Sequence, residues 1–153
     1  ATLLARGEIS DGEQINVVVP TGNFGNILAA SYAKQMGVPI AKLICASNEN
    51  KVLFDFFTTG CYDRNRDFIL TTSPSMDILI SSNLERLIYQ TAGRDAEKNN
   101  EFMKELNTNG VYTITDDMKE QTSTGTMQQK KRQHRPSKKF TIKQITSLIP
   151  TQR

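Results

Sequence analysis

The sequence predicts an α/β domain in which parallel strands are flanked by helices, and two observations carry this prediction. The first is a buried-strand pattern at residues 15–19 that passes through a glycine turn into a helical pattern at 24–36. The second is another apolar strand pattern at 41–46, which follows after Gly37 and Pro39. A strand, a helix and a strand joined this closely form a βαβ unit, so the two strands should be parallel.

The spacing of apolar residues predicts the other helices. Residues 1–8 have the pattern of a helix end, and we expect them to continue from an earlier part of a larger protein. Apolar residues recur three and four positions apart in three further segments, for which we expect helices: 50–59, 75–89 and 97–106. Ser75 is expected to cap the second of these, because Ser73 and Pro74 precede it in a typical helix start.

The last recognisable elements are short. Residues 111–114 (Val-Tyr-Thr-Ile) are expected to be short and extended. Residues 115–118 have the composition of a helix cap, but the body of a helix is not apparent after them.

The turn between the first strand and its helix carries the strongest chemical signal, in the residues Thr21-Gly22-Asn23-Phe24-Gly25-Asn26. The two glycines allow the backbone to approach a ligand closely. The free N–H groups and the positive dipole end of the following helix would then face an anion. The alternative is plain turn chemistry, since sharp strand-to-helix turns need glycine whether or not they bind anything.

The spacing of the glycines in this turn limits the class of anion that it could bind. Gly22 and Gly25 lack the G-x-G-x-x-G spacing of dinucleotide sites, and no Gly-Lys-Ser/Thr of a Walker loop follows. A single phosphate held by backbone amides suits a cofactor with one phosphate, such as pyridoxal phosphate.

Four segments in order closely resemble threonine synthase. They are Val19-Pro20-Thr21-Gly22-Asn23-Phe24-Gly25-Asn26, the run from Ala33 to Ile40, the run from Ile44 to Asn50, and Ser73-Pro74-Ser75-Met76-Asp77-Ile78 with Ser81-Ser82-Asn83-Leu84-Glu85-Arg86. The resemblance covers roughly residues 1–121. It implies a partial domain of the tryptophan synthase β-like fold, the fold type II of pyridoxal-phosphate enzymes.

The resemblance also implies an activity, a cofactor and a partner. Enzymes of this family convert O-phosphohomoserine and water to threonine and phosphate with pyridoxal 5′-phosphate, in threonine biosynthesis. The cofactor-binding residues carried over are Gly22, Asn23, Phe24, Gly25 and Asn26, whose backbone amides would hold the cofactor phosphate. Side-chain bonds from Asn23 and Asn26 stay open against ordinary turn or cap chemistry, and Phe24 is expected to pack rather than to react. Ser75 and Asn83 lie in motifs near the family's active site without an assigned role, and for Ser75 a helix cap is favoured over a substrate contact.

No catalytic residue is expected in this chain. The family's Schiff-base lysine lies upstream of the matching segment, and no lysine in residues 1–121 stands in a comparable motif. Lys34, Lys42 and Lys51 are interpreted as solvated side chains. Because covalent catalysis with this cofactor needs an amine, we expect the chain alone to be inactive.

Charge divides the chain into two parts, residues 1–121 and residues 122–153. The first part carries eleven Lys and Arg against sixteen Asp and Glu, whereas the second carries eight Lys and Arg and no acid. The resemblance stops near Gln121, and back-translation of the second part with a two-base offset restores family-like segments. We therefore expect residues 122–153 to be a basic, disordered tail of non-native sequence, the product of a shifted reading frame.

The alternative function is a small binding module whose basic arm contacts nucleic acid or acidic membranes. Under the enzyme interpretation we expect no specific nucleic-acid partner, no metal site and no membrane partner. No stretch is long or apolar enough to span a bilayer, and no signal-peptide pattern is present. Cys45 and Cys61 lack metal-ligand spacing and are expected to be reduced thiols in a cytoplasmic protein.

Overall fold

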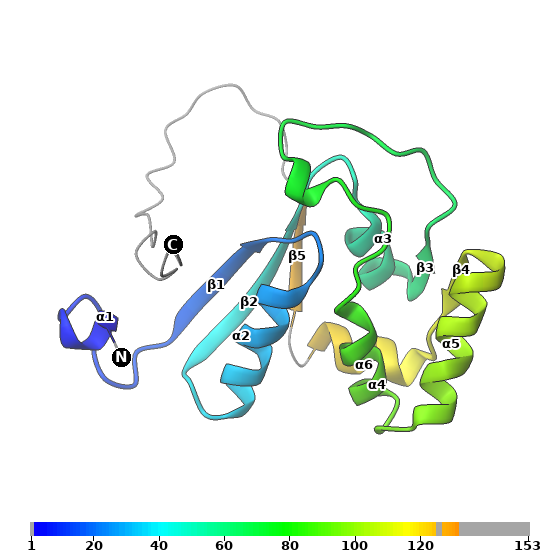
Figure 1. Ribbon diagram of the computed structural model, residues 1–153. Helices are drawn as coiled ribbons and strands as arrows, with labels where there is room; N and C mark the ends of the chain where they lie inside the picture. Colours follow the sequence, from blue (N-terminus) through cyan, green and yellow to red (C-terminus); the bar gives the residue numbers. More distant parts are fainter. Residues whose placement is uncertain (1, 125–126, 132–153) are drawn as a thin grey trace, which may run out of the picture.

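The computed structural model describes residues 2–124 and 127–131. A three-stranded sheet forms its centre, with the order β1-β2-β5, and all the neighbouring strands are parallel. The strands are β1 (Ile15–Pro20), β2 (Ile40–Ser47) and β5 (Met127–Lys131). Figure 1 shows α2 (Gly25–Gln35) lying along β1 and β2, as expected for the crossover helix of a βαβ unit. The predicted parallel pairing of the first two strands is confirmed.

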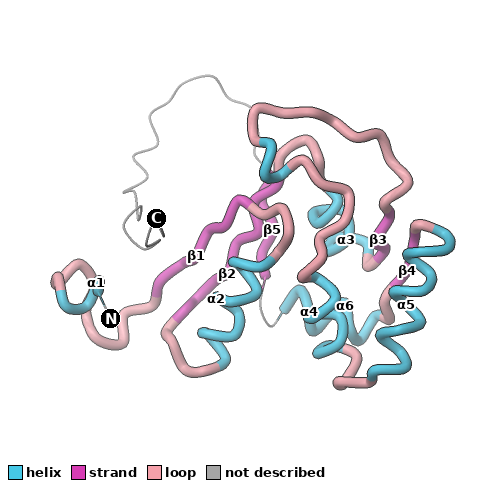
Figure 2. Tube along the Cα trace, viewed as in Figure 1, coloured by secondary structure: helices cyan, strands magenta, loops and turns pink. Residues whose placement is uncertain are grey.

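The helices beside the sheet form a second group, which Figure 2 shows next to β5 and away from β1. Its elements are α3 (Val52–Thr59), α4 (Leu84–Thr91), α5 (Ala96–Asn109), α6 (Asp116–Thr124) and the antiparallel pair β3 (Cys61–Asp63) and β4 (Val111–Thr113). A short helix α1 (Thr2–Ala5) stands at the N-terminal end of the described chain. The predicted helices at 50–59 and 97–106 are confirmed with small shifts of their ends.

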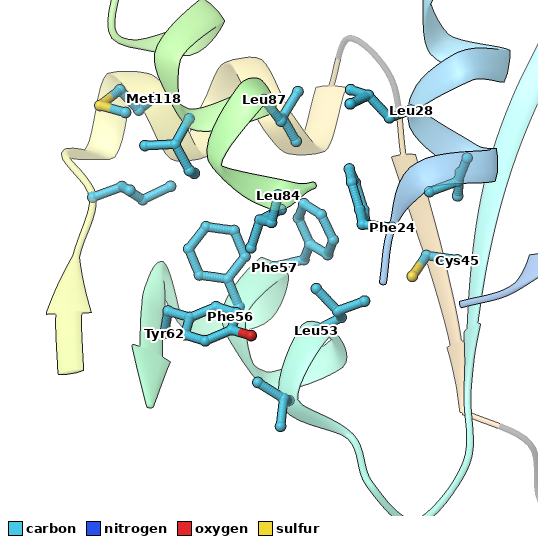
Figure 3. Packing of buried hydrophobic residues seen from close by; sticks show 14 of the residues in the cluster. Phe24, Leu28, Cys45, Leu53, Phe56, Phe57, Tyr62, Leu84, Leu87 and Met118 are labelled. Atoms are coloured by element: carbon cyan, nitrogen blue, oxygen red, sulfur yellow. The ribbon is translucent and has the colours of Figure 1, made fainter. Parts of the chain in front are cut away.

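The core between the two groups is dominated by aromatic rings. The rings of Phe56 and Phe57 lie 5.2 Å apart, and Tyr62 stacks on Tyr112 at 5.5 Å with an interplanar angle of 6°. Phe24 reaches the same core from the turn before α2, with its ring 5.8 Å from that of Phe57. In Figure 3 the rings of Phe24, Phe56 and Phe57 converge with Leu84. The turn at the head of α2 is therefore anchored to the centre of the protein.

One predicted helix is wrong. In place of a continuous helix over 75–89, the chain forms a single turn of 3₁₀ helix at Pro74–Met76, an irregular stretch, and then α4 from Leu84. The apolar spacing of Met76, Ile78 and Leu79 suggested a helix, but in this stretch tertiary hydrogen bonds replace the helical ones. The hydroxyl of Tyr62 donates to the carbonyl of Leu79 at 3.0 Å and accepts the amide of Ser81 at 2.8 Å. Ser75 therefore caps no long helix, and the cap position before the short turn, Ser73, makes no side-chain cap bond.

The end of the described chain also differs from the prediction. Residues 115–118 were expected to be a cap without a helix, yet α6 continues to Thr124, anchored by the buried Met118 and Thr122. Residues 127–131 form β5, with Met127 paired to Leu43 and Lys131 to Ser47. Residues 122–124 thus end α6 and residues 127–131 lie on the free edge of β2, which offers a ladder of backbone groups to an extended segment. The rest of the predicted tail lies outside the described residues, and its reading-frame origin stays a prediction.

Candidate functional site

The candidate site is the turn that joins β1 to α2, at the carboxyl end of the central strand pair. Thr21 closes the ladder, since its amide donates to the Ala46 carbonyl at 3.0 Å and its hydroxyl donates to the Val19 carbonyl at 2.7 Å. Ligands of open parallel sheets bind outside the carboxyl ends of the strands, and this turn lies there.

The backbone amides of residues 22–26 have no recorded protein acceptors in the described part of the chain. Among the residues that the structure describes, no hydrogen bond is recorded from any of these five N–H groups. Gly25 and Asn26 are the first two residues of α2, so their amides are also the unpaired donors of a helix start. Successive free amides at the positive end of a helix dipole form a concavity that favours an anion.

Two carbonyls of the turn are held from the side of α4. The Ser81 hydroxyl donates to the Gly22 carbonyl at 2.6 Å, and Asn83 donates to the Asn23 carbonyl from its side chain at 2.9 Å and from its amide at 3.2 Å. In a trans peptide the carbonyl and the N–H point in opposite directions. The amides of Asn23 and Phe24 are therefore directed away from α4, which leaves them free for a ligand.

Phe24 adopts a strained backbone conformation at the centre of the turn. Its φ of 68° and ψ of −4° lie in the left-handed region, which costs a residue with a Cβ about 1–3 kcal/mol. The buried ring against Phe57 offsets that cost and fixes the conformation. Phe24 is thus a packing residue, as predicted, whose main chain shapes the turn.

Gly22 is required by close backbone contact. A Cβ built on Gly22 would stand 2.2 Å from the Ser75 carbonyl oxygen, a distance that no real Cβ shows. A Cβ on Gly25 would meet only the side-chain amide of Asn83, at 3.3 Å. Ser75, predicted to cap a helix, instead contacts the turn at Gly22 through its main-chain carbonyl.

The segment that carries Ser75 is held by one carboxylate. Asp77 accepts the Thr71 amide at 2.8 Å, the Thr71 hydroxyl at 2.7 Å and the Asn50 side chain at 2.9 Å, with Asn48 at 3.4 Å. The Thr71 amide, with the side-chain donors, holds the pKa of Asp77 below its usual value. These bonds join the segment before α4 to the end of β2 and so position the Ser75 carbonyl.

The side chains of Asn23 and Asn26 make no hydrogen bond of their own in the described part of the chain. Asn23 and Asn26 are exposed, and no side-chain hydrogen bond is recorded for either among the described residues, so neither acts as an ordinary cap. Both amides remain available to a ligand. Cys45, beside Thr21, is buried, and burial raises the pKa of its thiol to about 11, so it stays protonated.

The lysines predicted to be solvated are partly engaged. Lys34 donates to the Ala41 carbonyl at 3.1 Å, and Lys51 pairs with Asp55 at 3.0 Å. Lys42 is exposed on β2. Within the described chain, no group of three or more His, Cys, Asp or Glu that could hold a metal ion is present, and no helix is long and apolar enough to cross a membrane.

Sequence reasoning found the turn but missed what supports it. Ser81, Tyr62 and Asp77 were not singled out, and Asn83 had no role. One signal was available: Ser81-Ser82-Asn83 places three polar residues inside the expected helix over 75–89, where they interrupt its apolar pattern.

The chain is similar in sequence to several known proteins. A curated relative, threonine synthase-like 1 of Macaca fascicularis, is 52% identical over 113 residues, which is 73% of this chain and 15% of the relative. Threonine synthase of Saccharomyces cerevisiae is 45% identical over 113 residues, covering 68% of this chain and 22% of the enzyme. No protein-family profile matches the chain.

The solved structures agree with the sequence relatives. The chain superposes on a threonine synthase from Brucella melitensis, solved with pyridoxal phosphate bound, with a TM-score of 0.76 and 38% identity. The superposition covers 83% of this chain and 27% of that one. The chain thus spans about a quarter or less of the length of these relatives.

Proposed function

Because this chain is a segment of the threonine synthase family, we propose that residues 22–26 form the half-site that holds the phosphate of pyridoxal 5′-phosphate. The observation that carries this proposal is the row of five backbone amides without recorded acceptors, at the start of α2. The Brucella relative binds this cofactor.

The residues present fit a phosphate group. The contact between Gly22 and the Ser75 carbonyl leaves no room for a side chain, so the main chain itself forms the surface. The amides of Asn23 and Phe24 are directed outward by Ser81 and Asn83, and the exposed Asn23 and Asn26 side chains add two more donors. No carboxylate lies among residues 21–26 to repel a dianion.

The chain's own residues bind and orient; they supply no reacting group. Bound pyridoxal phosphate supplies an electron sink for carbanions at the substrate. In the intact enzyme that chemistry would turn O-phosphohomoserine and water into threonine and phosphate. The lysines Lys34 and Lys51 are engaged away from the turn, so no free amine is offered to the cofactor by them. We therefore expect the chain to bind the cofactor phosphate without turnover.

Binding is tested with a ligand that cannot react with lysines. Pyridoxine 5′-phosphate, which has no aldehyde, is titrated into the ¹⁵N-labelled 153-residue chain, and pyridoxine without the phosphate is the control ligand. We expect saturable amide shifts centred on residues 22–26 with the phosphate ester and with inorganic phosphate, and none with pyridoxine. Equal shifts with pyridoxine, or no shifts in the turn, would contradict the proposal.

A matched pair of variants separates the turn from unspecific charge effects. Ser81→Ala releases the Gly22 carbonyl and should weaken phosphate binding by about three- to tenfold, as loss of one hydrogen bond does. Lys42→Gln removes an exposed charge on β2 and should leave binding unchanged. Phosphate release from O-phosphohomoserine by this chain with added pyridoxal phosphate would disprove the expected inactivity.

A further inference from the structure

A second cavity lies between α2 and α4, apart from the turn. It measures about 450 Å³, within the range of roughly 300–1,000 Å³ that small-molecule sites occupy. None of residues 21–26 lines it. Its walls come from α2, α4, α5 and the turn between α4 and α5, and the residues that bear on the argument are Tyr32, Glu85, Arg86, Tyr89, Arg94 and Asn99.

The charges on the walls have both signs. Glu85 supplies one carboxylate, and Arg86 and Arg94 supply two guanidinium groups. Among the described residues no ion pair is recorded for any of the three. A pure anion would be attracted by the arginines and repelled by Glu85, whereas a ligand with both charges satisfies all three groups.

Asn99 gives the independent sign of a ligand. The residue is 6% exposed and lines the cavity, and its Oδ1 is a buried acceptor with no partner among the described residues. Its Nδ2 donates to Glu85 Oε1 at 3.4 Å, which places amide and carboxylate side by side. An unpaired buried acceptor is unfavourable and rare, so such a group calls for an explanation. Because this oxygen is itself buried, a ligand reaches it only when the Asn99 side chain turns; an ammonium group bound to Glu85 in place of Asn99 Nδ2 could then donate to Asn99 Oδ1 as well.

We propose that this cavity binds the zwitterionic head of an α-amino acid. The ammonium would lie against Glu85 and Asn99, and the carboxylate would lie against Arg94 and Arg86, since guanidinium matches carboxylate in two-point geometry. Tyr32 and Tyr89 supply flat walls for the aliphatic part. This site is separate from the phosphate turn and does not depend on the function proposed for it.

Two hydrogen bonds in sequence link the cavity to the turn. Arg86 donates to Asn83 Oδ1, and Asn83 donates to the Asn23 carbonyl at 2.9 Å. A carboxylate that recruits Arg86 would compete with Asn83 for the guanidinium. Occupation of the cavity should therefore shift the Asn83 side-chain resonances as a secondary effect.

The test is a ligand series on the ¹⁵N-labelled full chain at low ionic strength. L-alanine is compared with N-acetyl-L-alanine, which has no ammonium, L-alanine methyl ester, which has no carboxylate, and inorganic phosphate. We expect saturable shifts at the Asn99 side-chain amide and the Arg94 Nε–H with L-alanine, and at least about tenfold weaker binding for both one-ended analogues. Equal binding of an analogue, absence of saturation, or shifts confined to residues 22–26 would overturn the proposal.

Variants on the exposed walls complete the test, because they do not touch the core. Glu85→Gln and Arg94→Gln should each weaken L-alanine binding about tenfold, whereas Glu101→Gln on the exposed side of α5 should not change it. Unchanged binding in both wall variants would refute the site. Pyridoxine 5′-phosphate binding at residues 22–26 is measured on the same samples, so failure of one site is distinguished from failure of the other.

Discussion

Replacing Gly22 with alanine tests whether the turn is shaped by close backbone contact. The new Cβ would stand 2.2 Å from the Ser75 carbonyl oxygen, and real Cβ atoms do not approach closer than 3.0 Å. The two segments must therefore separate by at least 0.8 Å, and the obstacle is main chain that cannot rotate away.

Both sides of this contact are held in place. The Gly22 carbonyl is bonded to Ser81 at 2.6 Å, and the Ser75 segment is fixed by the Asp77 carboxylate and by the Met76 amide, which donates to the Ser73 carbonyl at 2.8 Å. Overpacking costs typically 1–3 kcal/mol, and pinned segments place Gly22→Ala in the upper part of that range. Alanine restricts the unfolded chain and regains about 0.4–1 kcal/mol. We therefore expect a net loss of about 1–2 kcal/mol in the free energy of unfolding.

Urea unfolding followed by circular dichroism measures this loss, and Gly25→Ala is the matched control. The Cβ at Gly25 meets only the end of the Asn83 side chain, and Gly25 begins α2, where alanine favours the helix. Gly25→Ala should be neutral or stabilising by up to about 1 kcal/mol. A Gly22→Ala variant as stable as the native chain, or a Gly25→Ala variant that loses as much, would show that the contact with Ser75 does not shape the turn.

Three further predictions test the supports of the site. Asp77 has a lowered pKa in the folded chain, so its contribution to stability is fully present above the carboxyl's unfolded pKa and is lost as the pH falls through its folded pKa. Asp77→Asn should therefore flatten the plot of urea midpoint against pH between about pH 5 and 2. An unchanged plot would contradict this prediction. Tyr62→Phe removes the hydroxyl that accepts a hydrogen bond from the buried Ser81 amide. The free energy of unfolding in urea should fall by about 1–3 kcal/mol, and phosphate binding should weaken as well. A loss of stability with unaltered phosphate affinity would show that Tyr62 supports the fold but not the turn. With a pKa of about 11, only about one in a thousand Cys45 thiols is ionised at pH 8. A disulfide reagent should therefore modify Cys45 only as fast as the chain unfolds. Rapid modification of the folded chain would refute the burial of this thiol.

Local sequence patterns determined the first half of the fold. The β-branched run before Gly22, the helical spacing after it and the second apolar strand fix a parallel strand pair with a crossover helix, since these elements are defined by neighbours in the chain. The same local pattern located the turn for which we propose phosphate binding, because a glycine turn between a strand and a helix leaves free amides at the helix start.

Only the tertiary structure decided the segment from residue 71 to residue 83. Its apolar spacing favours a helix, but Tyr62 and Asp77 supply hydrogen bonds that a helix would have to forgo. Those partners are distant in sequence, so no local pattern reveals them. The same holds for β5, whose place depends on the open edge of β2.

The sequence by itself thus determined which backbone amides are left without intrahelical partners at the start of α2, because helix starts and glycine turns are encoded by adjacent residues. The tertiary structure decided how those amides are aimed. The Gly22 carbonyl is held by Ser81 and the Asn23 carbonyl by Asn83, across 59 and 60 positions of sequence. Only glycine fits at position 22, because a Cβ there would stand 2.2 Å from the Ser75 carbonyl oxygen. The physical reason is that a peptide's orientation depends on what bonds its carbonyl, and here those groups come from another part of the chain.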